Sequence, residues 1–473
     1  MHALLGHDLE QTGVQCDHVR PAARRVPRED VALQRLEHLF GDQVADGFQV
    51  AAIVRRLQRD EALARLSQEA FDVESGRKIH KDIMTNLNKG EVAMLVMLDL
   101  SAAFDTIDHH ILLERLEKLY GIRGTVLKWF KSYLTNRTQS VVINEKESSH
   151  KLLKYGVPQG SKLGPILFNA YIAPLSNIPD KHGVSDEKYA DDEQLLLSFK
   201  PTKISDQNNA ITKMENCIND IRNFLLDNKL CNNDEKTEFM IIGCPQQIKK
   251  IENNFIQVHN VKINAADKVK NLGVLFDKTM TMESQVNFMC KKVFLNLKNI
   301  SMIRKSLNKE DAKVAVNALV TPHLDYGNAL LCGINQKYIS KLQIAQNSAA
   351  RLIERLKKHD HISHVRKELH WLPVSSRIKF KLLNMTWKAL NSQAPPYVMD
   401  LLRPRVKTET NLRNNNKILL HHAPSNNRYG ARAFSFIAPL LWNELPEDIK
   451  LSCSNDVFKR RLKTHLFKTS YGC

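Results

Sequence analysis

The sequence lacks any run of about 18 or more apolar residues in its 473, so no transmembrane helix is expected. Its eight cysteines include no Cys-x-x-Cys pair, which argues against a zinc module or a disulfide framework and fits a reducing compartment. The first residues also lack the basic and long apolar regions of a secretory signal. The length exceeds one ordinary hydrophobic core and predicts about two or three domains.

Lysine and asparagine are missing from residues 1–77, although both are frequent in the rest of the chain. This segment carries ten arginines and thirteen acidic residues, whereas residues 78–473 carry 59 basic and 38 acidic residues. This change in composition predicts a separate domain or a segment joined through an error in the gene model. Within the segment, helical periodicity is present at 31–40 and 50–57. The surplus of basic residues in 78–473 favours a polyanionic partner, with nucleic acid first and an anionic membrane second.

Two adjacent carboxylates occupy a predicted turn in the sequence Tyr189-Ala190-Asp191-Asp192. Neighbouring carboxylates repel one another, and hard carboxylate oxygens suit divalent cations such as Mg²⁺. The apolar run 93–98 reads as a buried strand and ends on a third carboxylate, Asp99. A buried strand that ends on a carboxylate, paired with an Asp-Asp turn, predicts a two-metal site for phosphoryl transfer.

Hydrophobic periodicity predicts further helices and strands along the chain. Strands are expected at 140–144, 238–242 and 269–276. Helices are expected at 79–87, 111–119, 126–134, 166–172, 204–226, 286–303, 310–319, 339–356, 378–390 and 458–467. The helices after residue 283 carry many lysines and arginines, so they predict a separate basic domain.

Three glycines and two prolines lie within residues 156–165, a composition typical of a rigid loop that a backbone or a ligand approaches closely. Gln159 and Ser161 lie in this loop, before a predicted helix N-terminus that favours anions. Asp108 precedes another predicted helix and is expected to cap it rather than to act in catalysis.

Three motifs, in this order and spacing, resemble those of the reverse transcriptases of non-LTR retrotransposons, with the jockey and CR1/L2-like lineages the most similar. They are Leu98-Asp99-Leu100-Ser101-Ala102-Ala103-Phe104-Asp105, Gly156-Val157-Pro158-Gln159-Gly160-Ser161 and Tyr189-Ala190-Asp191-Asp192. Lys236-Thr237-Glu238 and Asn271-Leu272-Gly273-Val274 resemble the next two motifs of the family. The resemblance runs from about residue 78 to the C-terminal end.

The resemblance implies an RNA-directed DNA polymerase that takes an RNA template, a DNA primer and dNTPs, acts in the nucleus and has no membrane partner. Asp99, Asp191 and Asp192 would hold two Mg²⁺ ions, or Mn²⁺ in their place. Phe104 would exclude the ribose 2′-hydroxyl, Gln159 and Gly160 would line the nucleotide and template pocket, and Lys236 would approach the triphosphate. Residues 272–273 would grip the primer end.

The implied fold is α+β: a right-hand polymerase palm, with an antiparallel sheet and helices, followed by a helical thumb-like C-terminal domain. The expected boundaries are 1–77 for the foreign segment, 78–280 for the palm with partial fingers, 281–405 for the basic thumb-like helices and 406–473 for a basic tail. The basic fingers motifs of the family have no counterpart in 1–77, which predicts truncated fingers.

Two departures from the family pattern leave other readings open. Lys162 and Glu193 stand where the family more often has an aliphatic and a hydroxyl residue. One alternative is an inactive retroelement remnant that binds nucleic acid through its basic helices. Another is a group II intron or other cellular reverse transcriptase. The sequence carries no signal for the oligomeric state.

Overall fold

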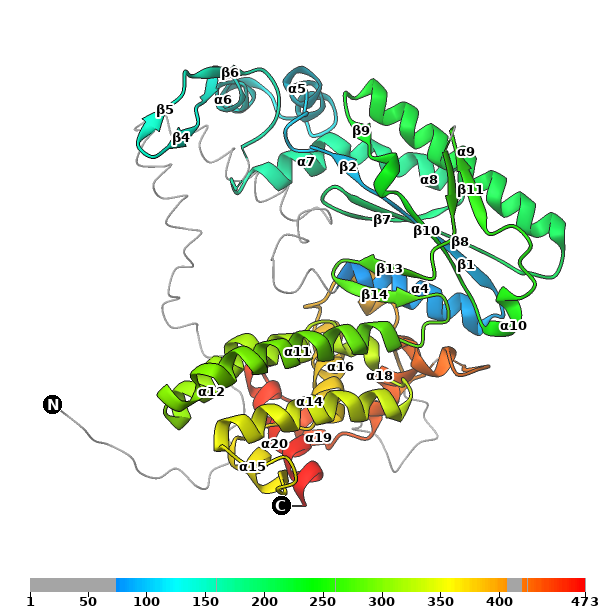
Figure 1. Ribbon diagram of the computed structural model, residues 1–473. Coiled ribbons are helices and arrows are strands. Elements are labelled where there is room, and N and C mark those ends of the chain that lie inside the picture. The colour runs from blue at the N-terminus through cyan, green and yellow to red at the C-terminus, as the bar shows by residue number, and fades with distance from the viewer. Residues whose placement is uncertain (1–73, 159, 260, 406–418, 423, 473) are drawn as a thin grey trace.

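A computed structural model describes residues 74–158, 160–259, 261–405, 419–422 and 424–472. Its architecture is α+β, as the sequence predicts, with a sheet-containing part in the N-terminal half and a bundle of helices in the C-terminal half (Figure 1). The helices predicted at 31–40 and 50–57 lie outside the described residues. None of the described helices is long and apolar enough to cross a bilayer.

The central element is a four-stranded antiparallel sheet in the order β10-β1-β8-β7. Its strands are β1 (Val92–Leu98), β7 (Ser185–Tyr189), β8 (Asp192–Phe199) and β10 (Glu238–Ile242). The expected strands at 93–98 and 238–242 are therefore confirmed. The central strand β1 is apolar throughout because both faces of the sheet are covered.

The two faces of the sheet belong to different hydrophobic clusters. Val92, Met94 and Val96 of β1 pack with helices α5 (His109–Lys118), α6 (Gly124–Leu134), α7 (Gly164–Ile172) and α9 (Ile204–Asp227). Ala93 and Leu95 point to the other face, where α4 (Glu74–Asn88) and the C-terminal helices lie. Successive side chains of a strand alternate between faces, so β1 contributes side chains to both hydrophobic clusters.

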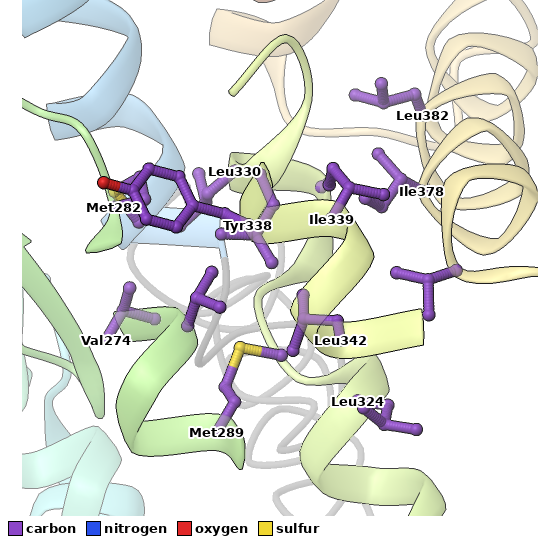
Figure 2. Close-up of a cluster of buried hydrophobic side chains, with 14 of the residues drawn as sticks. Val274, Met282, Met289, Leu324, Leu330, Tyr338, Ile339, Leu342, Ile378 and Leu382 are labelled. Atoms are coloured by element: carbon purple, nitrogen blue, oxygen red, sulfur yellow. The ribbon is translucent and has the colours of Figure 1, made fainter. Parts of the chain in front are cut away.

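The C-terminal helices share their core with the hairpin of β13 (Lys268–Asn271) and β14 (Val274–Asp277). They are α11 (Glu283–Ile303), α12 (Lys309–Leu319), α13 (Thr321–Asp325), α14 (Gln336–Glu354), α15 (Ser363–Glu368), α16 (Val374–Leu390), α17 (Pro396–Met399), α18 (Phe434–Asn443), α19 (Glu447–Lys450) and α20 (Asn455–Tyr471). Figure 2 shows Val274 of the hairpin near Met289 of α11 and Leu342 of α14. Burying each such side chain contributes about 1.5–3 kcal/mol, so the hairpin is held firmly on the helices.

Shorter elements complete the fold. The strands are β2 (Leu100–Ser101), β3 (Arg137–Gln139), β4 (Val142–Ile143), β5 (Lys146–Glu147), β6 (Lys151–Leu153), β9 (Cys231–Asn232), β11 (Phe255–Val258), β12 (Val261–Asn264), β15 (Arg403–Pro404) and β16 (Leu420–His421). The short helices are α8 (Asn177–Lys181), α10 (Pro245–Ile248) and the 3₁₀ turns at Ala173–Ser176, Asp234–Lys236, Arg304–Ser306, Asn328–Leu331 and Gly430–Arg432. Of the strand predicted at 140–144, only Val142–Ile143 is a strand, β4, and β3 precedes the predicted range.

A loop near the C-terminus is hydrogen-bonded to the C-terminal end of α4. Asn427 donates from Nδ2 to the carbonyl of Leu87 at 2.8 Å, and the backbone N–H of Asn426 donates to Oδ1 of Asn88 at 2.8 Å. Arg432, in the following 3₁₀ turn, donates to the carbonyl of Met280 at 2.6 Å. These bonds join three segments that are far apart in the sequence.

Candidate active site

Asp99 follows directly on β1 and lies across from Asp192, the first residue of β8. In the ladder between these strands Leu98 pairs with Glu193, so the next antiparallel pair is Asp99 with Asp192. The apolar run of β1 fixes the register, because a slip by one residue would move its side chains to the opposite face of the sheet. Two carboxylates from distant segments are therefore brought together at one edge of the sheet.

The turn between β7 and β8 carries the third carboxylate. Tyr189 pairs with Asp192, so Ala190 and Asp191 form a two-residue hairpin loop. Ala190 has φ of +52°, in the left-handed region where a side chain costs about 1–2 kcal/mol. The strands on either side hold this strained turn in place, with Asp191 beside the pair of Asp99 and Asp192.

The charges at this edge are not balanced. Burial raises the pKa of Asp192, and the neighbouring charges of Asp191 and Asp99 raise it further, although its side chain remains accessible to solvent. Lys236 lies in the 3₁₀ turn before β10, and its Nζ is 3.1 Å from Oδ2 of Asp99. The lysine side chain is 67% exposed, so it partners Asp99 from the solvent side.

A cleft of about 360 Å³ opens in front of these residues. Its lining includes Asp99, Asp192 and Lys236 on one side, and Asn271 and Leu272 of the β13–β14 hairpin on the other. It also includes Met97, Leu98, Glu193, Gln194, Glu235, Glu238 and Lys270. The first, third, fourth and fifth of the five motifs therefore face one space, which is open enough for a ligand.

The tip of the β13–β14 hairpin is anchored from two directions. Asn271 donates from Nδ2 to Oε1 of the buried Gln194 on β8 at 2.6 Å. The hydroxyl of Tyr326, after α13, donates to the carbonyl of Leu272 at 2.6 Å. Sequence reasoning missed Gln194 and Tyr326. The period of two along β8, which places Gln194 on the same face as Asp192, is the signal that was available for Gln194.

The Gly-rich loop 156–165 packs against the segment that follows Asp99. The N–H of Val157 donates to the carbonyl of Phe104 at 2.9 Å, and the N–H of Gly156 donates to that of Ile107 at 2.8 Å. A Cβ at Gly156 would lie 2.8 Å from the carbonyl oxygen of Asp105, so this close approach requires glycine. Phe104 stacks on Phe168 of α7 with ring centroids 4.8 Å apart.

The same loop shows a structural role for Ser161. Its Oγ accepts a hydrogen bond from the backbone N–H of Gly164 at 2.9 Å. This N–H at the start of α7 is therefore already bonded and is not available to the anion that the sequence analysis expected there. Gly160 is exposed with φ of +75°, and Gln159 lies outside the described residues. Neither Phe104 nor Gly160 lines the cleft beside Asp99. Asp108 accepts from the N–H groups of His110 and Ile111, which confirms the predicted helix cap.

Glu193 points away from the cleft acids into the protein, with its side chain only 3% exposed. Burial raises its pKa to about 7, and the charge of Lys188 partly opposes this rise. The Nζ of Lys188 is 3.8 Å from Oε1 of Glu193 and 3.0 Å from Oδ2 of Asp186, and it donates to Oγ of Ser176 at 2.7 Å. Neither carboxylate oxygen of Glu193 has a hydrogen-bond partner among the described residues.

The donor chemistry at the cleft fits a divalent cation. Asp99, Asp191 and Asp192 offer hard oxygen ligands, and the raised pKa of Asp192 shows a local excess of negative charge that a cation would neutralise. In the described part of the chain no three His, Cys, Asp or Glu side chains already form a cation-sized cluster. The acids are thus neighbours, but they do not form a closed cage.

Residues 50–276 match the family described as reverse transcriptase (RNA-dependent DNA polymerase), a match that begins inside the segment 1–77. This part of the chain is thus similar to a reverse transcriptase domain.

The curated relatives that the chain matches are RNA-directed DNA polymerases of mobile elements. The chain is 25% identical over 352 residues to the probable RNA-directed DNA polymerase from transposon BS of Drosophila melanogaster, covering 68% of this chain and 35% of that protein. It is 25% identical over 278 residues to the RNA-directed DNA polymerase from mobile element jockey of Drosophila funebris, covering 56% and 29%. The chain thus spans about a third of the length of these relatives.

Similarity to solved structures is weak. Telomerase from Candida tropicalis in complex with a fragment of telomeric RNA is 14% identical, with a TM-score of 0.34 over 74% of this chain and 56% of that one. Telomerase from Candida albicans is 13% identical, with a TM-score of 0.33 over 68% and 55%. The similarity to reverse transcriptases therefore rests on the sequence match.

Proposed function

We propose that this chain is an RNA-directed DNA polymerase that extends a DNA primer by two-metal nucleotidyl transfer. The observation that carries the proposal is the placement of Asp99 across from Asp192, with Asp191 in the adjoining turn, at the mouth of an open cleft. RNA template, DNA primer and dNTPs are the substrates, and a nuclear site of action follows from the same proposal.

The three carboxylates would hold two divalent cations, Mg²⁺ or Mn²⁺, which lower the pKa of the primer 3′-hydroxyl and neutralise charge on the triphosphate and the departing pyrophosphate. The protein supplies position rather than covalent chemistry. Asp99 is held by a buried strand, and Asp191 and Asp192 are held by a strained two-residue turn. Rigid supports of this kind keep the ligands in place while substrates enter and leave.

Lys236 is a cationic group beside these acids, with its Nζ 3.1 Å from Oδ2 of Asp99. Its exposed side chain is free to turn from Asp99 towards a triphosphate in the cleft, where it would act as a charge partner or a proton donor. Leu272 lines the same cleft from the hairpin, and residues 272–273 would hold the primer end. The anchoring of this hairpin by Gln194 and Tyr326 supports that role.

Phe104 and the loop of Gln159 and Gly160 form the second part of the proposed site. The backbone bonds between residues 104–107 and 156–157 place Phe104 next to this loop. In this arrangement Phe104 would exclude a ribose 2′-hydroxyl, and the loop would line the nucleotide and template pocket.

The remaining domains follow the same proposal. Residues 78–280 would form the palm of a right-hand polymerase with partial fingers, 281–405 the thumb, and 406–473 a basic C-terminal segment. Helix α11 lies on the side of the helical half that is next to the β13–β14 hairpin (Figure 1). Its exposed lysines at 291, 292 and 298 would bind the phosphates of a template–primer duplex. The role of residues 1–77 stays open.

Primer extension on an RNA template with Mg²⁺ tests the proposal. Asp191→Asn should lower the rate of primer extension about 10²–10⁴-fold relative to wild type, because a lost metal ligand removes roughly 3–5 kcal/mol of transition-state stabilisation. Asp227→Asn, at an exposed aspartate at the end of α9, is the matched control and should extend normally. Equal extension by wild type and Asp191→Asn would refute the site assignment.

A second candidate function is binding of nucleic acid without catalysis. It would rest on the basic helices of the C-terminal half, whose exposed lysines could bind phosphates without any metal. No extension by wild type or by Asp191→Asn, with salt-sensitive binding of an RNA–DNA duplex retained by both, would establish this second function.

A further inference from the structure

Three aromatic rings form a continuous row at the surface of the helical half. His370 follows α15, and its ring centroid is 5.7 Å from that of Phe467 on α20, which is 4.8 Å from that of Tyr471. The hydroxyl of Tyr471 donates to the carbonyl of Trp371 at 2.7 Å, which fixes α20 against the end of α15. His370 is exposed, and the other two rings are half-buried. We call His370, Phe467 and Tyr471 the aromatic row.

Basic side chains border the aromatic row on both helices. Arg460 and Lys463 precede Phe467 by seven and four residues, so they lie on the same face of α20, and both are exposed. Lys367 is exposed on α15. Arg366 lies close enough to Tyr471 for its charge to oppose the burial that raises the pKa of that hydroxyl. Within the described residues these four side chains form no ion pair.

The acidic side chains near the row leave this charge largely uncompensated. Asp456 lies on the same face of α20 but is 3.5 Å from Lys459. Asp360 accepts from the backbone N–H of Lys357 at 2.7 Å. Glu368 is exposed at the end of α15, where its charge also acts on Lys309. The net charge around the aromatic row is therefore positive.

This surface is separate from the candidate active site. None of its residues lines the cleft beside Asp99. Helix α20 packs on α16, and α15 and α20 lie at the end of the helical half away from the sheet (Figure 1). A ligand on the aromatic row would not occupy the polymerase cleft.

We propose that the aromatic row and its basic border bind single-stranded RNA, as a second nucleic-acid site on this chain. Bases stack on aromatic side chains, while lysine and arginine contact the phosphates between them. A duplex is a poorer fit because its base faces are already stacked. A membrane surface is a poorer fit because α15 and α20 expose no large hydrophobic side chain, as insertion would require. The choice of RNA over DNA rests on the proposed function.

Crosslinking of the full chain to a labelled oligo(A) RNA, followed by mapping of the modified peptides, locates the site directly. Crosslinks are expected in residues 363–371 or 455–471. Crosslinks confined to the sheet-containing half would overturn the proposal, as would crosslinks to oligo(dA) at these residues without any to RNA. Binding to phosphatidylserine vesicles in place of RNA would also overturn it.

Affinity measurements on variants of the full chain test the chemistry. His370→Ala should weaken binding of oligo(A) RNA by about 5- to 100-fold, because the base that stacks on His370 loses its aromatic partner. Lys463→Glu should reduce the slope of log K against log salt by about 0.7. His364→Ala, at an exposed histidine of α15 that makes no ring contact among the described residues, is the matched control.

Equal loss of affinity in His370→Ala and His364→Ala would refute stacking at the aromatic row. Primer extension by the same variants separates this inference from the proposed function. The expected result is weakened oligo(A) binding in His370→Ala, with normal extension by His370→Ala, Lys463→Glu and His364→Ala on a primed template. Unchanged oligo(A) binding in His370→Ala refutes the second site, whether or not the chain proves to be a polymerase.

Discussion

Glu193 gives the sharpest test of the structure, because it is a buried carboxyl without a hydrogen bond among the described residues. Its nearest cation, Nζ of Lys188, is 3.8 Å away and is shared with Asp186 and Ser176. Burial therefore outweighs attraction, and the pKa of Glu193 rises from 4.5 to about 7 in the folded protein.

A raised carboxyl pKa makes folding less favourable at high pH. Below pH 4.5 the group is protonated in both states and has no effect on stability. Between pH 4.5 and about 7 the unfolded chain binds fewer protons than the folded one, so stability falls as the pH rises. Above pH 7 the loss is constant. A rise of about 2.5 pKa units corresponds to about 3 kcal/mol.

The neutral variant Glu193→Gln should therefore be more stable than wild type at pH 8, by up to about 3 kcal/mol, and nearly equal to it at pH 4.5. Urea denaturation at several pH values, followed by far-UV circular dichroism, measures the difference in the midpoints. Glu117→Gln, at an exposed glutamate of α5, is the control and should show no such pH-dependent gain. A Glu193→Gln variant that is less stable than wild type at pH 8 would refute the account of this side chain.

Three further substitutions test the supports of the site, each by thermal or urea denaturation. Gly156→Ala should destabilise the protein by about 2 kcal/mol or more, because φ is +85° and the new Cβ would lie 2.8 Å from the carbonyl oxygen of Asp105. Asp277→Ala should cost about 3 kcal/mol or more, because its carboxylate accepts from the backbone N–H groups of residues 279, 281 and 282 and from the hydroxyls of Thr279 and Thr281. Tyr326→Phe should cost about 1 kcal/mol, since it removes the bond to the carbonyl of Leu272.

Each of these three predictions can be contradicted by one outcome. Asp267→Ala is the control for Asp277→Ala: it removes an exposed ion pair with Lys278 and should change the free energy of unfolding by about 0–1 kcal/mol. An equally small change in Asp277→Ala would mean that the hydrogen bonds of the Asp277 carboxylate do not stabilise the fold. A Gly156→Ala protein as stable as wild type would mean that the loop does not approach Asp105 closely. A Tyr326→Phe protein that is unchanged in stability would mean that the hairpin does not depend on this bond.

Much of the fold is readable from local patterns. The run 93–98 is a buried strand, and the helices expected at 204–226 and 310–319 match α9 and α12 closely. These segments are long or uniformly apolar, so periodicity alone identifies them. The strand expected at 140–144 is less accurate, because β3 and β4 are short, exposed strands whose pairing partners in β6 and β5 follow across turns.

Within the candidate site, sequence motifs predict the chemistry of the acids but not their partners. The pairing of Lys236 with Asp99 joins residues that are 137 positions apart. The bond between Asn271 and Gln194 joins residues 77 positions apart, and Tyr326 reaches Leu272 from the helical half. Glu193 is visible in the sequence as a departure from the family pattern, but its burial depends on the packing of α9 against the sheet.

The sequence by itself determined which residues form the central strand and where Asp99, Asp191 and Asp192 lie along it and its neighbouring turn. It could do so because the period of side chains along a strand and the chemistry of a carboxylate are local properties. The tertiary structure alone decided that Lys236 partners Asp99, that the hairpin at 272–273 faces the acids, and that the row of His370, Phe467 and Tyr471 exists. These contacts depend on how distant segments pack, which no local period records.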